Sequence, residues 1–476
     1  MHLSALLFVD GAWREATGRR RTTLINPATE EPFAEVAAAD PADVHAAVES
    51  AQRAWEGGWR DLAPGRREAL LYAVARTLRE HREEIAQLER LQVGKPIRDA
   101  RDEAELGARC FEYYAGAVTK FGGQTLPVAR GGFDFTLRQP LGVVACIVPW
   151  NFPFAIACWK VAPALAAGNC VVLKPATLAP LTALKLGELA AAAGLPPGVM
   201  QVLPGSGAVL GEALVTHPLI RKVSFTGSTA VGRHIMALAA RDLKRVSLEL
   251  GGKSPNIVFA DADWEQAAAT SPLSVFANTG QDCCARSRVY VERPIFEPFV
   301  ERFIAATKQL VVGDPARPET QLGPLVSAAQ RATVEDFLAD ARARGSRLAC
   351  GGGRPLPRGW YLEPTVLLDV GREDPCWREE IFGPVVAITS FDDEAEMLRD
   401  VNASPYGLSG SIWTNDLGRA LRVCRAVQSG VLSLNCHHSV HVEAPFGGFK
   451  QSGLGRDLGL AALEGVTELK NVYVAA

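Results

Sequence analysis

The sequence lacks the charge imbalance and the basic clusters that are typical of nucleic-acid-binding and membrane-surface proteins. Its 50 Lys and Arg side chains stand against 53 Asp and Glu, a formal net charge of −3. The longest basic run is only Arg19-Arg20-Arg21, whereas such partners require a basic patch. We therefore expect a small-molecule ligand, with no nucleic acid and no membrane as partner.

An uninterrupted apolar segment long enough to cross a bilayer is also missing. The longest apolar stretch covers residues 141–159 and is interrupted by Pro149, Asn151 and Pro153. Because proline breaks a helix interior, a strand, a turn and a buried helix explain this stretch better than a membrane span. The N-terminus has no basic start and no small-residue cleavage site, so we expect no signal peptide and a cytoplasmic protein.

The cysteine pattern shows no disulfide framework. The ten cysteines are scattered, and only Cys283 and Cys284 are adjacent. This usage agrees with a reducing compartment in which most thiols are buried. Tandem repeats and low-complexity linkers are absent too, and 48% hydrophobic with 22% charged residues is typical of a globular protein. The 476 residues correspond to roughly two to four domains.

Alternating strands and helices predict an α/β fold. Residues 41–118 show helical periodicity, and from 141 to 261 short apolar strands alternate with helices, as in a parallel sheet covered on both faces. The stretch 246–260 is predicted as one strand region. A second alternating region, from about 264 to 430, is expected to form its own domain. Ligands bind such sheets at the carboxyl ends of their strands.

Gly227-Ser228-Thr229 is a candidate anion site, because it follows a predicted strand and opens a predicted helix. A helix start presents free backbone N–H groups and the positive end of its dipole to a phosphate. Ser and Thr are also common helix caps. The spacing leaves phosphate binding and simple capping equally open.

Two further segments place reactive side chains in unusual surroundings. Cys283 and Cys284 stand in a polar, Gly-containing turn, where a thiol is a candidate nucleophile as well as a plain buried residue. Glu249 ends an apolar strand and is followed by two glycines. It is either the ion-pair partner of a cation such as Lys253 or a general base whose pKa is raised by burial.

Seven motifs, in order, make the chain resemble the aldehyde dehydrogenase superfamily across essentially its whole length. They are PWNFP (149–153), LKPAT (173–177), FTGST (225–229), LELGGKSP (248–255), GQDCC (280–284), EEIFGPV (379–385) and PFGGFKQSG (445–453). The resemblance implies three parts: a parallel-sheet, Rossmann-like cofactor domain (1–120 and 141–251), a second α/β catalytic domain (252–451) and a small β oligomerisation element (121–140 and 466–476). A homodimer or homotetramer would follow.

The resemblance also implies that an aldehyde is oxidised to a carboxylic acid with NAD or NADP and water. Cys283 matches the nucleophile, the amide of Asn151 with the N–H of Cys283 matches the oxyanion hole, and Glu249 matches the base that hydrolyses the thioester. The positions implied to bind the cofactor are Trp150, Lys174, Thr177, Gly227, Ser228, Leu250, Glu380 and Phe382.

Three of these positions match particular ligands of the cofactor. Lys174 is similar to the residue that binds the adenosine ribose. Ser228 is similar to the residue that binds the pyrophosphate, and Glu380 to the residue that binds the nicotinamide ribose. Thr177 departs from the pattern, because many NAD-preferring members carry Glu three residues after the ribose-binding Lys. A carboxylate there repels a 2′-phosphate, whereas Thr accepts a phosphate or a hydroxyl, so NAD and NADP both stay open.

The loop 435–443 is a second departure. Its three His and one Cys invite a zinc hypothesis. The family uses no metal, the loop is contiguous, and no fourth ligand has the spacing of a structural zinc site, so we expect no metal. The resemblance instead implies a polar, titratable substrate rim that faces aromatic walls. The substrate-pocket residues are Phe152, Trp159, His437, His438 and Phe446.

Two other functions are possible for a chain of this kind. The acylating branch of the superfamily passes the acyl group to coenzyme A and generally lacks the hydrolytic Glu, so Glu249 argues against it. A non-catalytic structural protein on the same scaffold could lose its nucleophile, but Cys283 and Asn151 are both present.

Overall fold

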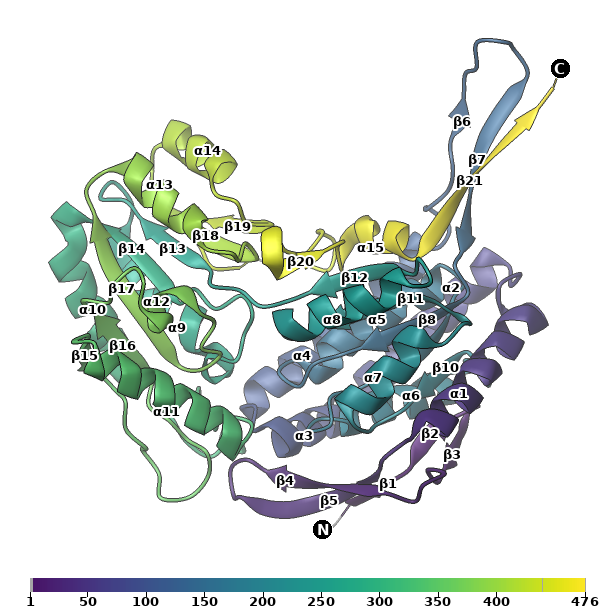
Figure 1. Ribbon diagram of the computed structural model, residues 1–476, viewed down its shortest axis with the longest axis horizontal. Coiled ribbons are helices and arrows are strands. Elements are labelled where there is room, and N and C mark those ends of the chain that lie inside the picture. The colour runs from purple at the N-terminus through teal and green to yellow at the C-terminus, as the bar shows by residue number, and fades with distance from the viewer. Residues whose placement is uncertain (1–2, 439, 476) are drawn as a thin grey trace.

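Two sheets divide the chain into two α/β bodies. The computed structural model describes residues 3–438 and 440–475. Figure 1 shows the larger body, with the N-terminal half of the chain, beside a smaller green body, and an arm that projects from the larger body at the C-terminus. This arrangement confirms the predicted α/β fold class.

An eight-stranded sheet forms the core of the larger body. Its five central strands are parallel and mostly buried, as expected for a sheet covered on both faces, and its edge strands pair in antiparallel fashion. The order across the sheet is β20 (Gly453–Leu454), β12 (Arg245–Glu249), β11 (Ile220–Thr226), β8 (Val143–Ile147), β9 (Cys170–Lys174), β10 (Met200–Val202), β2 (Leu7–Val9) and β3 (Ala12–Arg14).

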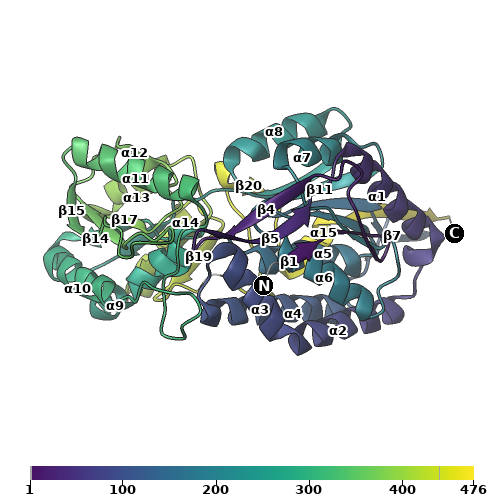
Figure 2. The same cartoon turned by 90° about the horizontal axis from the view of Figure 1, so that it is seen from below.

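Helices cover both faces of this sheet, and Figure 2 shows α7 and α8 on one face with α5 and α6 on the other. The helices of the larger body are α1 (Pro41–Ala54), α2 (Pro64–Glu80), α3 (Arg82–Val93), α4 (Ile97–Ala117), α5 (Pro153–Ala166), α6 (Leu181–Ala192), α7 (Gly207–Thr216), α8 (Thr229–Ala240) and α15 (Gly459–Gly465). The apolar stretch 141–159 forms strand β8, a turn and the first part of helix α5, as predicted. Within the described residues, no helix combines the length and the apolar character that a membrane crossing needs.

A seven-stranded sheet forms the core of the smaller body. It is parallel except for its edge strand β15, and its order is β15 (Arg347–Cys350), β16 (Thr365–Leu368), β17 (Val385–Phe391), β14 (Arg288–Glu292), β13 (Pro255–Val258), β18 (Ser409–Trp413) and β19 (Val431–Leu434). Its helices are α9 (Trp264–Phe276), α10 (Phe296–Lys308), α11 (Ala328–Ala343), α12 (Pro375–Arg378), α13 (Glu394–Ala403) and α14 (Leu417–Ala426).

The prediction of one strand region over 246–260 was wrong. Strand β12 ends at Glu249 in the first sheet, and β13 begins at Pro255 in the second sheet. The residues between them, 250–254, cross from one body to the other. Apolar patterning alone does not reveal such a crossing, because both halves are buried strands.

The arm is built from the two segments with predicted strand edges. Strand β21 (Thr467–Val474) pairs antiparallel with β7 (Phe133–Pro140), which also pairs with β6 (Thr125–Leu126). Residue 476 of the predicted element lies outside the described residues. Large apolar side chains remain exposed on the arm: Leu126, Phe133, Leu137, Leu469, Tyr473 and Val474.

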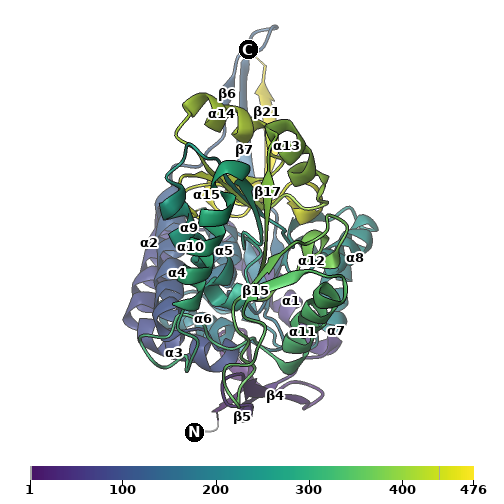
Figure 3. The same ribbon diagram turned by 90° about the vertical axis from the view of Figure 1, so that its left-hand side faces the viewer.

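A three-stranded sheet near the N-terminus was not predicted. It consists of β1 (Leu3–Ala5), β5 (Glu31–Ala37) and β4 (Arg21–Asn26). Figure 3 shows that this sheet and the arm lie at opposite ends of the molecule. The sequence signal for it was weak, since β4 and β5 carry many exposed polar residues.

Candidate active site

Cys283 follows a turn with unusual backbone geometry at the end of α9. In the short 3₁₀ segment Ala277–Gly280, Asn278, Thr279 and Gly280 have φ values of 51°, 57° and 70°. Left-handed conformations cost energy in residues other than glycine, and they persist where the surroundings hold them. The thiol therefore sits on a segment whose shape is imposed by its neighbours.

The two glycines after Glu249 let three chain segments meet at this point. A Cβ atom on Gly251 would collide with the carboxylate of Glu380, and a Cβ atom on Gly252 would collide with the carbonyl of Cys283. The N–H of Gly252 donates a hydrogen bond of 3.0 Å to Glu380. Close packing therefore explains the glycine pair.

Cys283 lines two cavities at once. The inner cavity, about 210 Å³, also contains Glu249 and the aromatic walls Phe152, Trp159 and Phe446. The neighbouring cleft, about 260 Å³, lies at the carboxyl ends of strands β8 and β11. Six predicted cofactor residues line it together with Asn151: Trp150, Gly227, Ser228, Leu250, Glu380 and Phe382. The sulfur stands where the inner cavity and the cleft meet.

The surroundings of Cys283 keep its thiol protonated at neutral pH. The side chains of Asp282, Cys283 and Cys284 place a carboxylate oxygen and two sulfur atoms within 4.8 Å of one another. A side-chain hydrogen bond with Cys284, followed by loss of water around the sulfur, raises the pKa of Cys283 well above its usual value. Since the thiolate is the reactive form, a proton must leave before the sulfur can attack.

Asn151 is tied to the segment that carries Cys283. Its side-chain Nδ2 donates a hydrogen bond of 3.0 Å to the carbonyl of Gln281. This is the one acceptor for the amide within residues 3–438 and 440–475, so its second N–H remains unused there. The backbone N–H of Cys283 likewise has no partner in the described part of the chain. Two donors are thus free beside the sulfur.

Glu249 is a buried carboxyl group without a partner. Its side chain is 3% exposed, and neither oxygen has a hydrogen-bond partner among the described residues. Burial, followed by the charge of Asp457, raises the pKa of Glu249 well above its usual value. Lys253, the ion-pair partner considered from the sequence, forms no ion pair with it in that part of the chain, so the geometry favours a titratable group over a structural ion pair.

The cleft presents groups that suit a dinucleotide. Ser228 is the N-cap of α8, and its Oγ accepts a hydrogen bond of 3.4 Å from Val231. Burial raises the pKa of Glu380 to about 7, and the rings of Trp150 and Phe382 pack edge to face at 5.3 Å. A helix start for a pyrophosphate and a carboxylate for ribose hydroxyls fit such a ligand.

Lys174 and Thr177 lie beyond this cleft, at the carboxyl end of β9. The ammonium of Lys174 donates to the carbonyl of Pro175 at 2.9 Å, and burial lowers its pKa to about 8. The hydroxyl of Thr177 donates to the carbonyl of Gly205 at 2.9 Å. A Cβ atom on Gly207 would lie 3.7 Å from the Lys174 ammonium, so both residues face the turn that opens α7.

His437 and His438 line an outer pocket of about 520 Å³ instead of the inner cavity. This pocket reaches Asp282 and Cys284, which also line the inner cavity, so the two spaces are neighbours. Residue 439 of the same loop lies outside the described residues.

The His437 ring is fixed and neutral. Its nitrogens lie 3.3 Å and 3.1 Å from the hydroxyls of Ser271 and Ser411. Burial, followed by the charge of Arg286, lowers the pKa of His437 to about 3. The prediction of a titratable rim is therefore wrong for His437, because a ring packed between two hydroxyls has lost the water that would stabilise its charged form.

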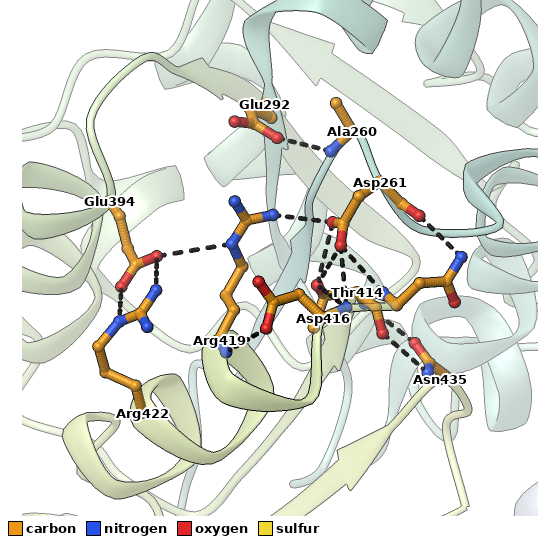
Figure 4. A network of polar contacts seen from close by, with 10 residues as sticks. Ala260, Asp261, Glu292, Glu394, Thr414, Asp416, Arg419, Arg422 and Asn435 are labelled. Atoms are coloured by element: carbon orange, nitrogen blue, oxygen red, sulfur yellow. Dashed lines mark hydrogen bonds and ion pairs between the residues drawn. The ribbon is translucent and has the colours of Figure 1, made fainter.

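A polar network fixes the start of this loop at the ends of β13 and β18, as Figure 4 shows. The side-chain amide of Asn435 exchanges two hydrogen bonds of 3.0 Å with the backbone of Thr414. The carboxylate of Asp261 accepts hydrogen bonds from the hydroxyl of Thr414 and from Arg419, both at 2.8 Å. The loop thus begins at a rigid point of the smaller body.

Comparisons with known proteins agree with this geometry. The model of the aldehyde dehydrogenase family matches residues 13–472. The chain is 40% identical to the putative aldehyde dehydrogenase DhaS of Bacillus subtilis (strain 168), over 98% of this chain and 95% of the relative. It is 42% identical to betaine aldehyde dehydrogenase 1 of Oryza sativa subsp. japonica, over 98% and 94%. The NAD+ complex structure of aldehyde dehydrogenase from Bacillus cereus has a TM-score of 0.97 at 40% identity, over 99% and 96%.

The chain belongs to the aldehyde dehydrogenase family. This membership confirms the resemblance read from the seven motifs and the predicted enzyme class, an NAD(P)-dependent aldehyde dehydrogenase. The cleft and the inner cavity accordingly bring together most of the residues that the motifs singled out.

Some residues of this aldehyde dehydrogenase site were not predicted. Asp457 lines the inner cavity, and Gln330 lines the cleft. Lys95, from the connection between α3 and α4, contacts the backbone of Asn151. The sequence carries no signal for Lys95, because a charged residue near an amphipathic helix is ordinarily part of a solvated face.

Proposed function

We propose that the chain oxidises an aldehyde to a carboxylic acid with NAD+ or NADP+ and water, through a covalent intermediate on Cys283. The observation that carries the proposal is the place of the sulfur, between an inner cavity that holds Glu249 and a cleft that fits a dinucleotide. The inner cavity then takes the aldehyde, and the cleft takes the nicotinamide end of the cofactor.

In the first half-reaction the Cys283 thiol gives its proton to solvent water, and the sulfur attacks the carbonyl carbon to give a thiohemiacetal. The carbonyl oxygen gains negative charge, which the amide of Asn151 and the N–H of Cys283 stabilise. The bound cofactor supplies the acceptor for the hydride that leaves this carbon, and the carbon reaches the oxidation state of a thioester. Lys174, Ser228 and Glu380 hold the cofactor.

In the second half-reaction Glu249 takes a proton from a water molecule that attacks the thioester. The carbon–sulfur bond breaks and the acid leaves. The thiolate of Cys283 then takes up the proton that Glu249 accepted, which restores both the thiol and the carboxylate. Burial of Glu249 supports this role, because a carboxylate with a raised pKa is a stronger base once it is ionised. Transfer of the acyl group to coenzyme A would not need this base.

The direct test is a mixture of the protein with NAD+ or NADP+ and a panel of aldehydes, in which the absorbance of the reduced cofactor is followed. Relatives are named for betaine aldehyde, retinal and indole-3-acetaldehyde, so these compounds open the panel. Formation of reduced cofactor in buffer without coenzyme A supports the proposal. Turnover that requires coenzyme A would favour the acylating reaction, and no reduced cofactor with any aldehyde would favour a non-catalytic role.

We further propose a cofactor domain at 1–120 and 141–251, a catalytic domain at 252–451, and an arm that pairs between subunits of a homodimer or homotetramer. The exposed apolar residues of the arm and the open edge of β21 support subunit pairing. A stable, active monomer in light scattering at micromolar concentration would contradict it. All ten cysteines are unpaired, which supports a cytoplasmic location.

A further inference from the structure

Lys95 is a fully enclosed cation beneath the segment that carries Asn151. It follows Gly94, the left-handed C-cap of α3, and precedes α4. Lys95 is 2% exposed. A buried ammonium is costly unless charges and hydrogen bonds compensate it, so its partners indicate what it is for.

Among the described residues the ammonium of Lys95 has three partners, and two of them belong to the Asn151 segment. It donates a hydrogen bond of 3.0 Å to the backbone carbonyl of Asn151. It lies 4.2 Å from the ring centre of Phe152, a cation–π contact. It also forms a buried ion pair with Glu103 of α4. The cation thus touches the backbone and the side chain that flank the peptide bond after Asn151.

The same cluster caps the first turn of α5. Helix starts leave backbone N–H groups without partners, and no side chain of α5's own N-cap residue supplies one. Glu89 accepts from the N–H of Phe154 at 3.1 Å, and Glu103 accepts from the N–H of Ala155 at 3.0 Å. Two carboxyl groups from α3 and α4 therefore fix the start of α5 directly after Asn151.

A second donor reaches the same carbonyl oxygen from the smaller body. Asn278, in the left-handed turn before Cys283, donates from Nδ2 to the carbonyl of Asn151 at 2.9 Å. The Asn151 carbonyl is therefore held between Lys95 and Asn278, while the Asn151 amide is held on Gln281. These bonds join the peptide of Asn151 to the segment that carries Cys283.

We infer that Lys95 is a positioning residue for the oxyanion donor: with Asn278 it clamps the Asn151 carbonyl, so that the side-chain amide of Asn151 is held at the sulfur of Cys283. The inference rests on the proposed role of Asn151. A displaced amide would weaken stabilisation of the thiohemiacetal oxygen and slow the first half-reaction. Cofactor affinity would be left nearly unchanged.

The test is a double-mutant cycle that measures the rate of the first burst of reduced cofactor. Lys95→Met should slow the burst about tenfold to a hundredfold, the range for misplaced catalytic groups, with little change in the Kd of the cofactor. In an Asn151→Ala background, Lys95→Met should have no further effect on the burst, because it acts through Asn151. Lys222→Met is the matched control: Lys222 is also buried, at 4% exposed, but no hydrogen bond joins it to Asn151, so its burst rate should stay near wild type.

A second variant keeps the test decisive if Lys95→Met does not fold. Asn278→Gly removes the other donor to the Asn151 carbonyl, and glycine accepts the φ of 51° without strain. Its control is Thr279→Gly at φ 57°, whose hydroxyl bonds to Gly323 instead. Asn278→Gly should slow the burst and be silent in the Asn151→Ala background, whereas Thr279→Gly should keep the wild-type rate.

The outcomes separate the inference from the function on which it rests. A wild-type burst in Asn151→Ala would contradict the proposed oxyanion role itself. A slow burst in Asn151→Ala with wild-type bursts in Lys95→Met and Asn278→Gly would overturn only the positioning role. An equal slowing of the burst by Lys95→Met in the wild-type and Asn151→Ala backgrounds would overturn the positioning role, because Lys95 would then act independently of Asn151.

Discussion

The segment 149–153 and the loop 435–443 flank the same site and are built in different ways. The first is secured by buried charged groups, with Lys95, Glu89 and Glu103 behind it. The second is secured at its start by hydroxyls and amides, with the ion pair of Asp261 and Arg419 behind Thr414, and most of its later described residues are exposed or half-buried. The difference suggests that the segment proposed to carry the oxyanion donor is held rigidly, while the loop proposed to form the substrate entrance is less constrained.

The largest expected effect concerns the thiol that both segments surround. Cys283→Ala should abolish turnover, because no other sulfur of the described residues lines both the inner cavity and the cleft. Binding of NAD+ or NADP+, measured by calorimetry, should stay nearly intact, since the residues proposed to hold the cofactor are unchanged. Turnover that survives in Cys283→Ala would refute the covalent mechanism.

Cys284→Ala is the matched change, and it should be mild. Its hydrogen bond raises the pKa of Cys283, so its removal should lower that pKa. The thiolate then forms at lower pH. The rise of the burst rate with increasing pH should therefore occur at lower pH than in the wild type, while the maximal rate changes little. A pH profile of the burst checks this, and a loss as large as that of Cys283→Ala would mean that the nucleophile has been misassigned.

A substitution at Thr177 should have an effect of intermediate size, on the preference between NADP+ and NAD+. If Thr177 lies beside the 2′ position, Thr177→Glu should shift the ratio of kcat/KM for NADP+ and NAD+ toward NAD+ by about 1–3 kcal/mol. Thr177→Val, which removes the hydroxyl without adding charge, is the control and should leave the ratio close to wild type. An unchanged ratio in Thr177→Glu would remove the support for NADP+ use.

The preference for NADP+ should also depend on pH, through the pKa of Lys174. Burial lowers this pKa to about 8, so the ammonium is charged below pH 8 and loses its proton as the pH rises through that value. If Lys174 pairs with a 2′-phosphate, KM for NADP+ should rise above pH 8 more than KM for NAD+. Parallel curves for the two cofactors would indicate that Lys174 does not meet the phosphate.

The smallest effect is expected in the outer loop. His437→Ala leaves the hydroxyls of Ser271 and Ser411 without their ring partner and should change KM for bulky aldehydes about twofold to tenfold, with the burst amplitude unchanged. His438→Ala changes the exposed neighbouring residue, and it should change KM for bulky aldehydes less than His437→Ala does. Because the pKa of His437 is about 3, these KM values should show no titration of this ring near neutral pH.

The sequence predicted the parts of the site that are short, local and chemically specific. Ser228 follows a strand and caps a helix, and Cys283 lies in a polar turn, so each could be identified from neighbours along the chain. The parallel sheets were predictable for the same reason, since buried strands alternate with helices.

The features that were missed depend on contacts between distant segments. The crossing at 250–254 looks like the middle of one strand region, and the requirement for Gly251 becomes visible only when Glu380 packs against it. Lys95 looks like a surface lysine until the fold brings it to Asn151, 56 residues away in the sequence. Neither apolar periodicity nor motif spacing carries such information.

One measurement tests the division of labour at Cys283 most directly: the first burst of reduced cofactor in Glu249→Gln and in Asn151→Ala. Glu249→Gln should release one burst of normal rate and then stall as an acyl-enzyme, visible as added mass on the intact protein, because only hydrolysis needs the base. Asn151→Ala should slow the burst itself by about 10²- to 10³-fold, as expected for one lost oxyanion donor. Equal loss of the burst in both variants, with no acyl-enzyme in Glu249→Gln, would contradict the assignment of the two residues to separate half-reactions.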